Sequence, residues 1–137
     1  MGLFGLLSGK NKLPVIVQES AAGMKPQIEA AREFYSSSAA FEARLASEGT
    51  AAFLHGFVLL FAAKHGVKAP ELLWAATVHT FDQVFGNRLS SSIVTSLQRT
   101  LREGTADHWI NEGAGAARYF DSEQLDLLTA FLKGGAS

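Results

Sequence analysis

The sequence predicts an all-α protein, a single compact bundle of about six or seven helices around one central apolar helix. Apolar residues recur at spacings of three and four along most of the chain, which is the period of an amphipathic helix. Strand-like alternation with a period of two is almost absent. Glycines and prolines interrupt the helical pattern at intervals that suit helix lengths. We therefore expect short connections and no linker that separates two domains.

The first fourteen residues differ from the rest of the chain. We assign residues 1–14 to an apolar and basic leader and residues 15–137 to the helical domain. The apolar part precedes Lys10 and Lys12 and is too short for the hydrophobic region of a signal peptide. A short amphipathic piece of this kind suits contact with a membrane surface, with its own domain or with a partner. Its apolar residues are Leu3, Phe4, Leu6 and Leu7.

Two helices are expected before the central one. The first covers about residues 15–22 and ends at Gly23, because glycine tolerates the left-handed conformation that follows a helix C-terminus. Pro26 opens the second helix, since a proline at the first helical position loses no hydrogen bond. The second helix extends to just before Gly49. The serines at 36–38 bend or split it, because their side chains compete for backbone hydrogen bonds.

The central helix covers about residues 51–64, in the most apolar run of the chain. Thr50 can cap its N-terminus, and Gly66 ends it. The apolar run is about a dozen residues long, whereas a helix that spans a bilayer needs roughly twenty. We therefore expect no transmembrane segment.

Four more helices are expected after the central one. Pro70 opens the first of them, and Gly86 ends it. The next covers about residues 91–102 and ends at Gly104, with one apolar stripe pointing inward. That stripe comprises Ile93, Val94, Leu97 and Leu101.

Two short helices complete the pattern. Thr105 can cap one that contains His108, and we interpret the glycine-containing stretch that follows, NEGAGAARYF, as a flexible turn. Asp121 can cap the last helix, which ends before Gly134. The apolar stripe of the last helix comprises Leu125, Leu128 and Leu132.

The composition excludes several classes of function. Twelve Lys and Arg are interspersed with thirteen Asp and Glu, so the chain lacks the basic surface that nucleic-acid binding requires. The absence of cysteine excludes disulfides, thiolate metal sites and a cysteine nucleophile, and it suits a reducing cytoplasm. The chain also lacks the G-x-S-x-G elbow of serine hydrolases and the H-E-x-x-H helix of zinc proteases. We expect neither enzymatic activity nor a metal site.

Two histidines stand in the apolar run. His55 lies in mid-helix, where a buried ring nitrogen needs a hydrogen-bond partner. His65 precedes the glycine that ends the helix, where the helix dipole favours positive charge. We interpret both as structural. In the alternative, the stretch AAKHGVKAPELLWAATVHTFDQVFG resembles the proximal-histidine region of a globin. This resemblance implies a haem or small-ligand carrier with His65, or else His55, as the ligand.

The opening MGLFGLLSGK and the compact, cysteine-free helical domain after it resemble small bacterial proteins of the toxin-immunity type. This resemblance implies a cytoplasmic, non-enzymatic inhibitor that occludes one cognate toxin or effector and needs no cofactor. It provides no residue pattern, so we choose candidate anchors by side-chain type and by position near bends or in the short sixth helix. The candidate partner-binding residues are Tyr35, His108, Trp109, Tyr119 and Asp121.

Two other interpretations of these residues stay open. Trp109 and Tyr119 also suit aromatic residues that cap the core. Exposed apolar area on the leader and the first helix suits a homodimer as well as a different partner.

Overall fold

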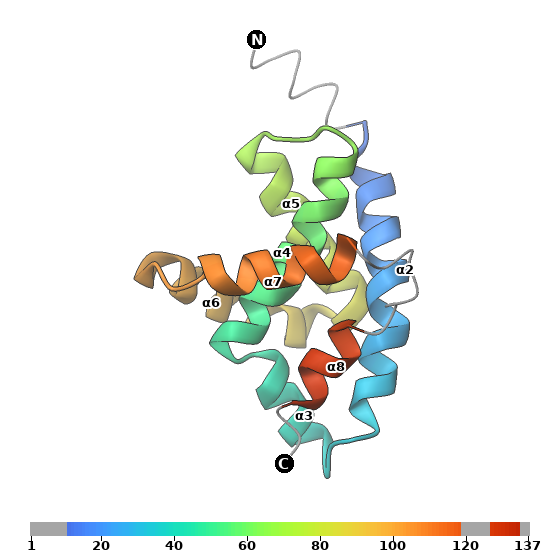
Figure 1. The fold of residues 1–137 in the computed structure, drawn as a ribbon, viewed down its shortest axis with the longest axis vertical. Helices are drawn as coiled ribbons and strands as arrows, with labels where there is room; N and C mark the ends of the chain where they lie inside the picture. Colours follow the sequence, from blue (N-terminus) through green and yellow to red (C-terminus); the bar gives the residue numbers. More distant parts are fainter. Residues whose placement is uncertain (1–10, 119–126, 135–137) are drawn as a thin grey trace.

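The computed structural model describes residues 11–118 and 127–134. Within these residues the chain forms seven helices and no strand, so the predicted all-α bundle is confirmed (Figure 1). The helices are α2 (Leu13–Arg32), α3 (Ser38–Leu45), α4 (Glu48–Lys64), α5 (Pro70–Phe85), α6 (Asn87–Glu103), α7 (Asp107–Arg118) and α8 (Leu127–Lys133).

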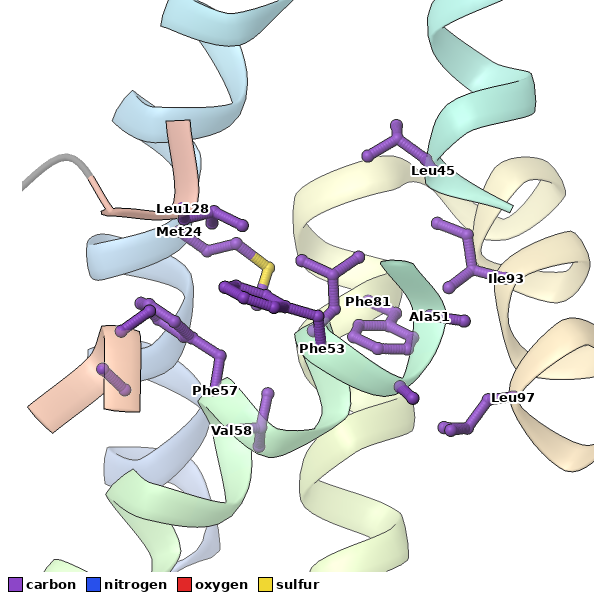
Figure 2. Packing of buried hydrophobic residues seen from close by; sticks show 14 of the residues in the cluster. Met24, Leu45, Ala51, Phe53, Phe57, Val58, Phe81, Ile93, Leu97 and Leu128 are labelled. Atoms are coloured by element: carbon purple, nitrogen blue, oxygen red, sulfur yellow. The ribbon is translucent and has the colours of Figure 1, made fainter. Parts of the chain in front are cut away.

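The apolar helix α4 is the centre of the bundle, as predicted. It contacts α2, α5, α6 and α7, and Figure 1 shows α7 crossing it. Eleven of its seventeen residues are buried, which requires neighbours on nearly every side. Figure 2 shows Met24 of α2 and Leu128 of α8 on one side of α4, and Ile93 and Leu97 of α6 on the other.

The backbones of α4 and α7 touch at two points. A Cβ atom placed on Gly56 would lie 2.0 Å from the carbonyl oxygen of Ile110, and one on Gly113 would lie 1.8 Å from the carbonyl oxygen of Phe53. Only glycine fits at either position, because these distances are far inside van der Waals contact. The flexible turn predicted for residues 111–120 is therefore wrong over residues 111–118, since this segment is the helical part of α7 that packs on α4, whereas residues 119–120 lie outside the described ranges.

Helix α2 is continuous where two helices were predicted. It begins at Leu13 and passes through Gly23 and Pro26, so neither residue marks a helix end. Proline inside a helix costs roughly 3 kcal/mol. That cost is offset by a long buried face on both sides of the proline, which includes Ile16, Met24 and Ile28.

The serine-rich stretch separates α2 from α3, which confirms that these residues split the predicted helix. The Ser37 hydroxyl accepts a hydrogen bond from the backbone N–H of Ala40 at 3.1 Å and so caps α3. Helix α4 begins at Glu48, two residues before the expected cap at Thr50. It ends at the expected place, before Gly66, which has a φ of 72°.

Helix α5 has the predicted bounds, but α6 begins four residues earlier than expected. Gly104 ends α6 with a φ of 73°, as predicted. The assignment of Leu101 to the buried stripe is wrong, because its side chain is 40% exposed. The buried face includes Ile93, Leu97 and Thr100, and Leu101 lies at the edge of that face, about 40° from Leu97 and about 100° from Thr100 around the helix axis.

Helix α8 is short and is capped by side chains of other helices. A helix of seven residues is marginal by itself. At its N-terminal end, the Gln27 Oε1 atom accepts hydrogen bonds from the N–H groups of Leu128 (2.9 Å) and Thr129 (3.4 Å). At its other end, Arg44 donates to the carbonyl oxygen of Phe131 at 2.7 Å. These contacts fix α8 beside α2 and α3.

Several predictions concern residues outside the described ranges. These residues are Leu3, Phe4, Leu6, Leu7, Lys10, Tyr119, Asp121 and Leu125. Within the described ranges, no single helix is both long and apolar enough to cross a membrane. Only α3 and α4 taken together reach that length and composition, and they are bent by 66°.

Candidate partner-binding grooves

Two of the predicted anchors, Tyr35 and Trp109, both contact the short helix α8. Tyr35 is half-buried beside Phe41, and its hydroxyl donates a hydrogen bond to the carbonyl oxygen of Leu132 in α8. The Trp109 ring lies 5.8 Å from the ring of Phe131, also in α8. Tyr35 therefore positions α8, whereas Trp109 lies where α7 and α8 meet.

Trp109 is half-buried and packs on the backbone of α4. A Cβ atom on Gly49 would lie 3.0 Å from its Cε2 atom, so the ring rests on the first turn of α4. His108 is exposed, and its ring lies 4.8 Å from the Trp109 ring in an edge-on arrangement. These two predicted anchors thus form one aromatic pair at the surface.

Phe131 connects this pair to the core. Its ring is stacked on Phe53 of α4, with centroids 3.9 Å apart. The Arg44 guanidinium lies 4.6 Å from the same ring, in addition to its hydrogen bond with the Phe131 carbonyl. Stacking and a cation–π contact together fix the orientation of the ring.

Between α7 and α8 lies a groove of about 450 Å³, which we call the α7–α8 groove. The rings of Phe53 and Phe131 contribute aromatic surface to it, and Glu112 is the one charged residue among those that line it. The other lining residues are small or aliphatic, and they comprise Gly115, Ala116, Leu127 and Ala130.

The charge of Glu112 is unneutralised in the described part of the chain, where it has no ion-pair partner. Gly115 leaves space in the groove, because a Cβ atom placed there would meet nothing within 4 Å. The groove is therefore preformed, mostly apolar and negatively charged at one point.

A second groove, of about 430 Å³, lies between α5 and α6, and we call it the α5–α6 groove. Its lining residues are Trp74, Gln98, Leu101 and Arg102. Reasoning from the sequence missed this groove because it assigned Leu101 to the core. The helical period did not resolve this position, because Leu101 is four residues after Leu97, which favours the buried face, and one residue after Thr100, which does not.

His55 is buried in the core and lines neither groove. Its ring is joined to the hydroxyl of Thr77 by a hydrogen bond of 2.7 Å between Nδ1 and Oγ1. Burial lowers the pKa of His55 from 6.5 to about 4, because the charged form loses its hydration. The imidazole is thus neutral at pH 7.

His65 lies at the end of α4 and contacts α2. Its Nε2 atom forms a hydrogen bond with the carboxylate of Glu19, and its carbonyl oxygen accepts a hydrogen bond from Lys12 at 3.0 Å. A haem ligand needs a free ring nitrogen that faces a large cavity. In this structure the Nε2 atom of His65 is bonded to Glu19, and the Nδ1 atom of His55 is bonded to Thr77 inside the core.

Among the described residues, no group of three or more His, Asp or Glu side chains is placed to hold a metal ion. No protein-family model matches the sequence, and comparisons with curated proteins and with solved structures gave no significant match.

Proposed function

We propose that this chain is a non-enzymatic protein-binding module that recognises one protein partner through the α7–α8 groove. The observation that carries the proposal is the groove itself, a preformed apolar depression beside the surface pair of His108 and Trp109. Tryptophan is among the residue types that contribute most to binding energy at protein interfaces. Glu112 adds a charge that selects a partner with a basic group next to an apolar one.

The surroundings of the groove favour binding without rearrangement. Gly56 and Gly113 allow α7 to lie directly on the α4 backbone, so α7 cannot shift inward. Gln27 and Arg44 cap the two ends of α8. A surface that is already ordered loses little conformational entropy on binding, which favours high affinity from a small contact area.

The kind of partner follows from the resemblance to immunity-type proteins. On that basis the partner is a bacterial toxin or effector, and this chain neutralises it in the cytoplasm by covering its active site. Such an inhibitor needs a rigid surface and no catalytic group of its own, which agrees with a site made of a groove and an aromatic pair.

The proposal is tested by capture of the partner followed by filling of the groove. The tagged protein is used to recover binding proteins from the native lysate, and the affinity of a stoichiometric partner is then measured with purified components. The variant Gly115→Leu adds a side chain at a residue that lines the groove, and its Cβ atom would meet nothing within 4 Å. Ala63→Leu, at an exposed position near the other end of α4, is the matched control.

We expect Gly115→Leu to weaken binding by at least about tenfold, while Ala63→Leu leaves the affinity unchanged and both variants keep their helix content. Inhibition of a toxic activity of the partner would identify its class. Equal affinities for the two variants, or the absence of any stoichiometric partner, would contradict the proposal.

A further inference from the structure

We infer that the α5–α6 groove is a second docking surface, which takes an acidic segment of a partner protein with a carboxylate next to an apolar side chain. This inference does not depend on the proposed function, because it concerns other helices and a surface of opposite charge. It rests on the exposure of Leu101, on the charge of Arg102 and on the support of Trp74.

Leu101 is a large apolar side chain that is partly exposed on α6. Large apolar side chains are mostly buried in this protein, yet Leu101 is 40% exposed on α6. Its neighbours on the exposed side of α6 are polar, and they include Thr95, Gln98 and Arg102. Leu101 and the half-buried ring of Trp74 therefore place apolar surface beside polar side chains in this groove.

Arg102 gives the α5–α6 groove a positive charge. Helix α6 has three arginines, of which Arg88 is paired with Glu42 at 3.0 Å and Arg99 with Glu48 at 3.4 Å. Arg102 has no ion-pair partner within the described ranges, and it is the arginine that lines the groove. No acidic residue lines this groove with it.

The chemistry of the occupant follows from these residues. A guanidinium prefers carboxylates, which it binds with two parallel hydrogen bonds. Leu101 and Trp74 offer apolar surface next to that charge, and the Gln98 amide can both donate to and accept from a peptide backbone. A protein segment with a glutamate or aspartate beside an aliphatic residue satisfies all of these groups.

The Trp74 side of the groove is held in place by contacts with the core. The Trp74 ring lies 6.1 Å from the ring of buried His55 in an edge-on arrangement, and His55 is in turn bonded to Thr77. Trp74 is thus supported by the core of the bundle. An aromatic side chain that is fixed in this way before binding costs little entropy when it is covered.

The test uses the two tryptophans of the chain as reporters, one beside each groove. In the variant Trp109→Phe, fluorescence reports on Trp74 alone. The probes are two tetrapeptides of equal length, acetylated at the N-terminus and amidated at the C-terminus, one that alternates leucine with glutamate and one that alternates leucine with lysine. The indole N–H resonances of the wild-type protein give a second readout that needs no substitution.

We expect the glutamate peptide to produce a saturable change at Trp74 and to bind about tenfold more tightly than the lysine peptide. Arg102→Gln should abolish this preference, whereas the matched variant Arg99→Gln should retain it. Three outcomes would overturn the inference. These are no saturable change at Trp74, equal binding of both peptides, and equal effects of the two arginine variants.

A glutamate peptide that shifts the Trp109 resonance and leaves Trp74 unchanged would also overturn the inference, since it would place the acidic segment in the other groove. Because the peptides contain no part of the proposed toxin partner, failure of this test leaves the proposed function intact. Failure of the capture experiment likewise leaves this inference intact.

Discussion

Two neighbours of α4, α7 and α5, show two different ways to bury one helix. Toward α7, the backbones touch at Gly56 and Gly113, and there is no space for even one methyl group. Toward α5, α4 presents His55, a polar side chain that is buried because Thr77 satisfies one of its nitrogens. The first contact depends on shape and the second on hydrogen bonding.

These two contacts show how a glycine and a histidine inside an apolar helix should be interpreted. A glycine in such a helix can mark the close approach of a second helix rather than the end of the first. A histidine in such a helix can be a satisfied core residue rather than a ligand. The two contacts should also fail in different ways when they are perturbed.

A single methyl group added at the contact between α4 and α7 should cause the largest loss of stability. In Gly113→Ala the new Cβ atom would lie 1.8 Å from the carbonyl oxygen of Phe53, so α7 must move away from α4. We expect the free energy of unfolding to fall by at least about 3 kcal/mol, although alanine is the better helix former. Urea denaturation monitored by circular dichroism measures this loss. Wild-type stability in this variant would show that the helices are not in backbone contact.

A fall in pH should cause the next largest loss of stability, through His55 at the contact between α4 and α5. His55 is neutral in the folded protein because burial lowers its pKa to about 4, whereas the unfolded chain takes up a proton near pH 6.5. Its contribution to stability is therefore complete above pH 6.5 and is lost as the pH falls toward 4, by roughly 3 kcal/mol.

The variant His55→Gln isolates this contribution, because all other groups titrate in both proteins and cancel in the difference. The free energies of unfolding of the two proteins should converge, or change order in favour of the variant, as the pH falls from 7 to 4. A difference that stays constant over this range would contradict the assigned burial of His55.

Removal of the hydroxyl that satisfies His55 should have an intermediate effect. Thr77→Val keeps the shape of the side chain but leaves a buried ring nitrogen without its partner. We expect a loss of about 2 kcal/mol by thermal or urea denaturation. Thr77→Ser keeps the hydroxyl and loses one methyl group, so its loss should be about 1 kcal/mol. A larger loss in the serine variant would mean that packing dominates this contact.

The smallest effect, and the only gain, should come from Gly115→Ala. This position is two residues after Gly113 in the same helix, but a Cβ atom there meets nothing within 4 Å. Alanine restricts the unfolded chain and favours the helix, so stability should rise by about 1 kcal/mol. If this variant lost as much stability as Gly113→Ala, the contact with α4 would not explain the first prediction.

Much of the helical pattern was predictable because its signals are local. The glycines at 66, 86 and 104 have positive φ angles of 72° to 81°, which few other residues adopt, and each ends a helix as predicted. By contrast, Pro26 and Gly113 lie inside helices, because burial against neighbouring helices outweighs their unfavourable local preference. Local preference alone cannot reveal that balance, since it depends on what lies across the contact.

The candidate site was predictable only in part, for the same reason. Trp109 was expected either as a partner anchor or as an aromatic that caps the core, and it lies half-buried against the core beside exposed His108. The groove beside them needs α4 and α8, which come from distant parts of the sequence. Tyr35 was expected to bind a partner, and instead its hydroxyl contacts α8. Leu101 was missed because one residue along a helix separates a buried position from an exposed one.

Hydrogen exchange in the complex with the captured partner tests most directly whether the α7–α8 groove binds a protein. Backbone amides of residues 107–118 and 127–134 should exchange more slowly in the complex than in the free protein. Those on the exposed side of α6 should exchange at the same rate in both. Slower exchange that is confined to other helices, with α7 and α8 unchanged, would contradict the account.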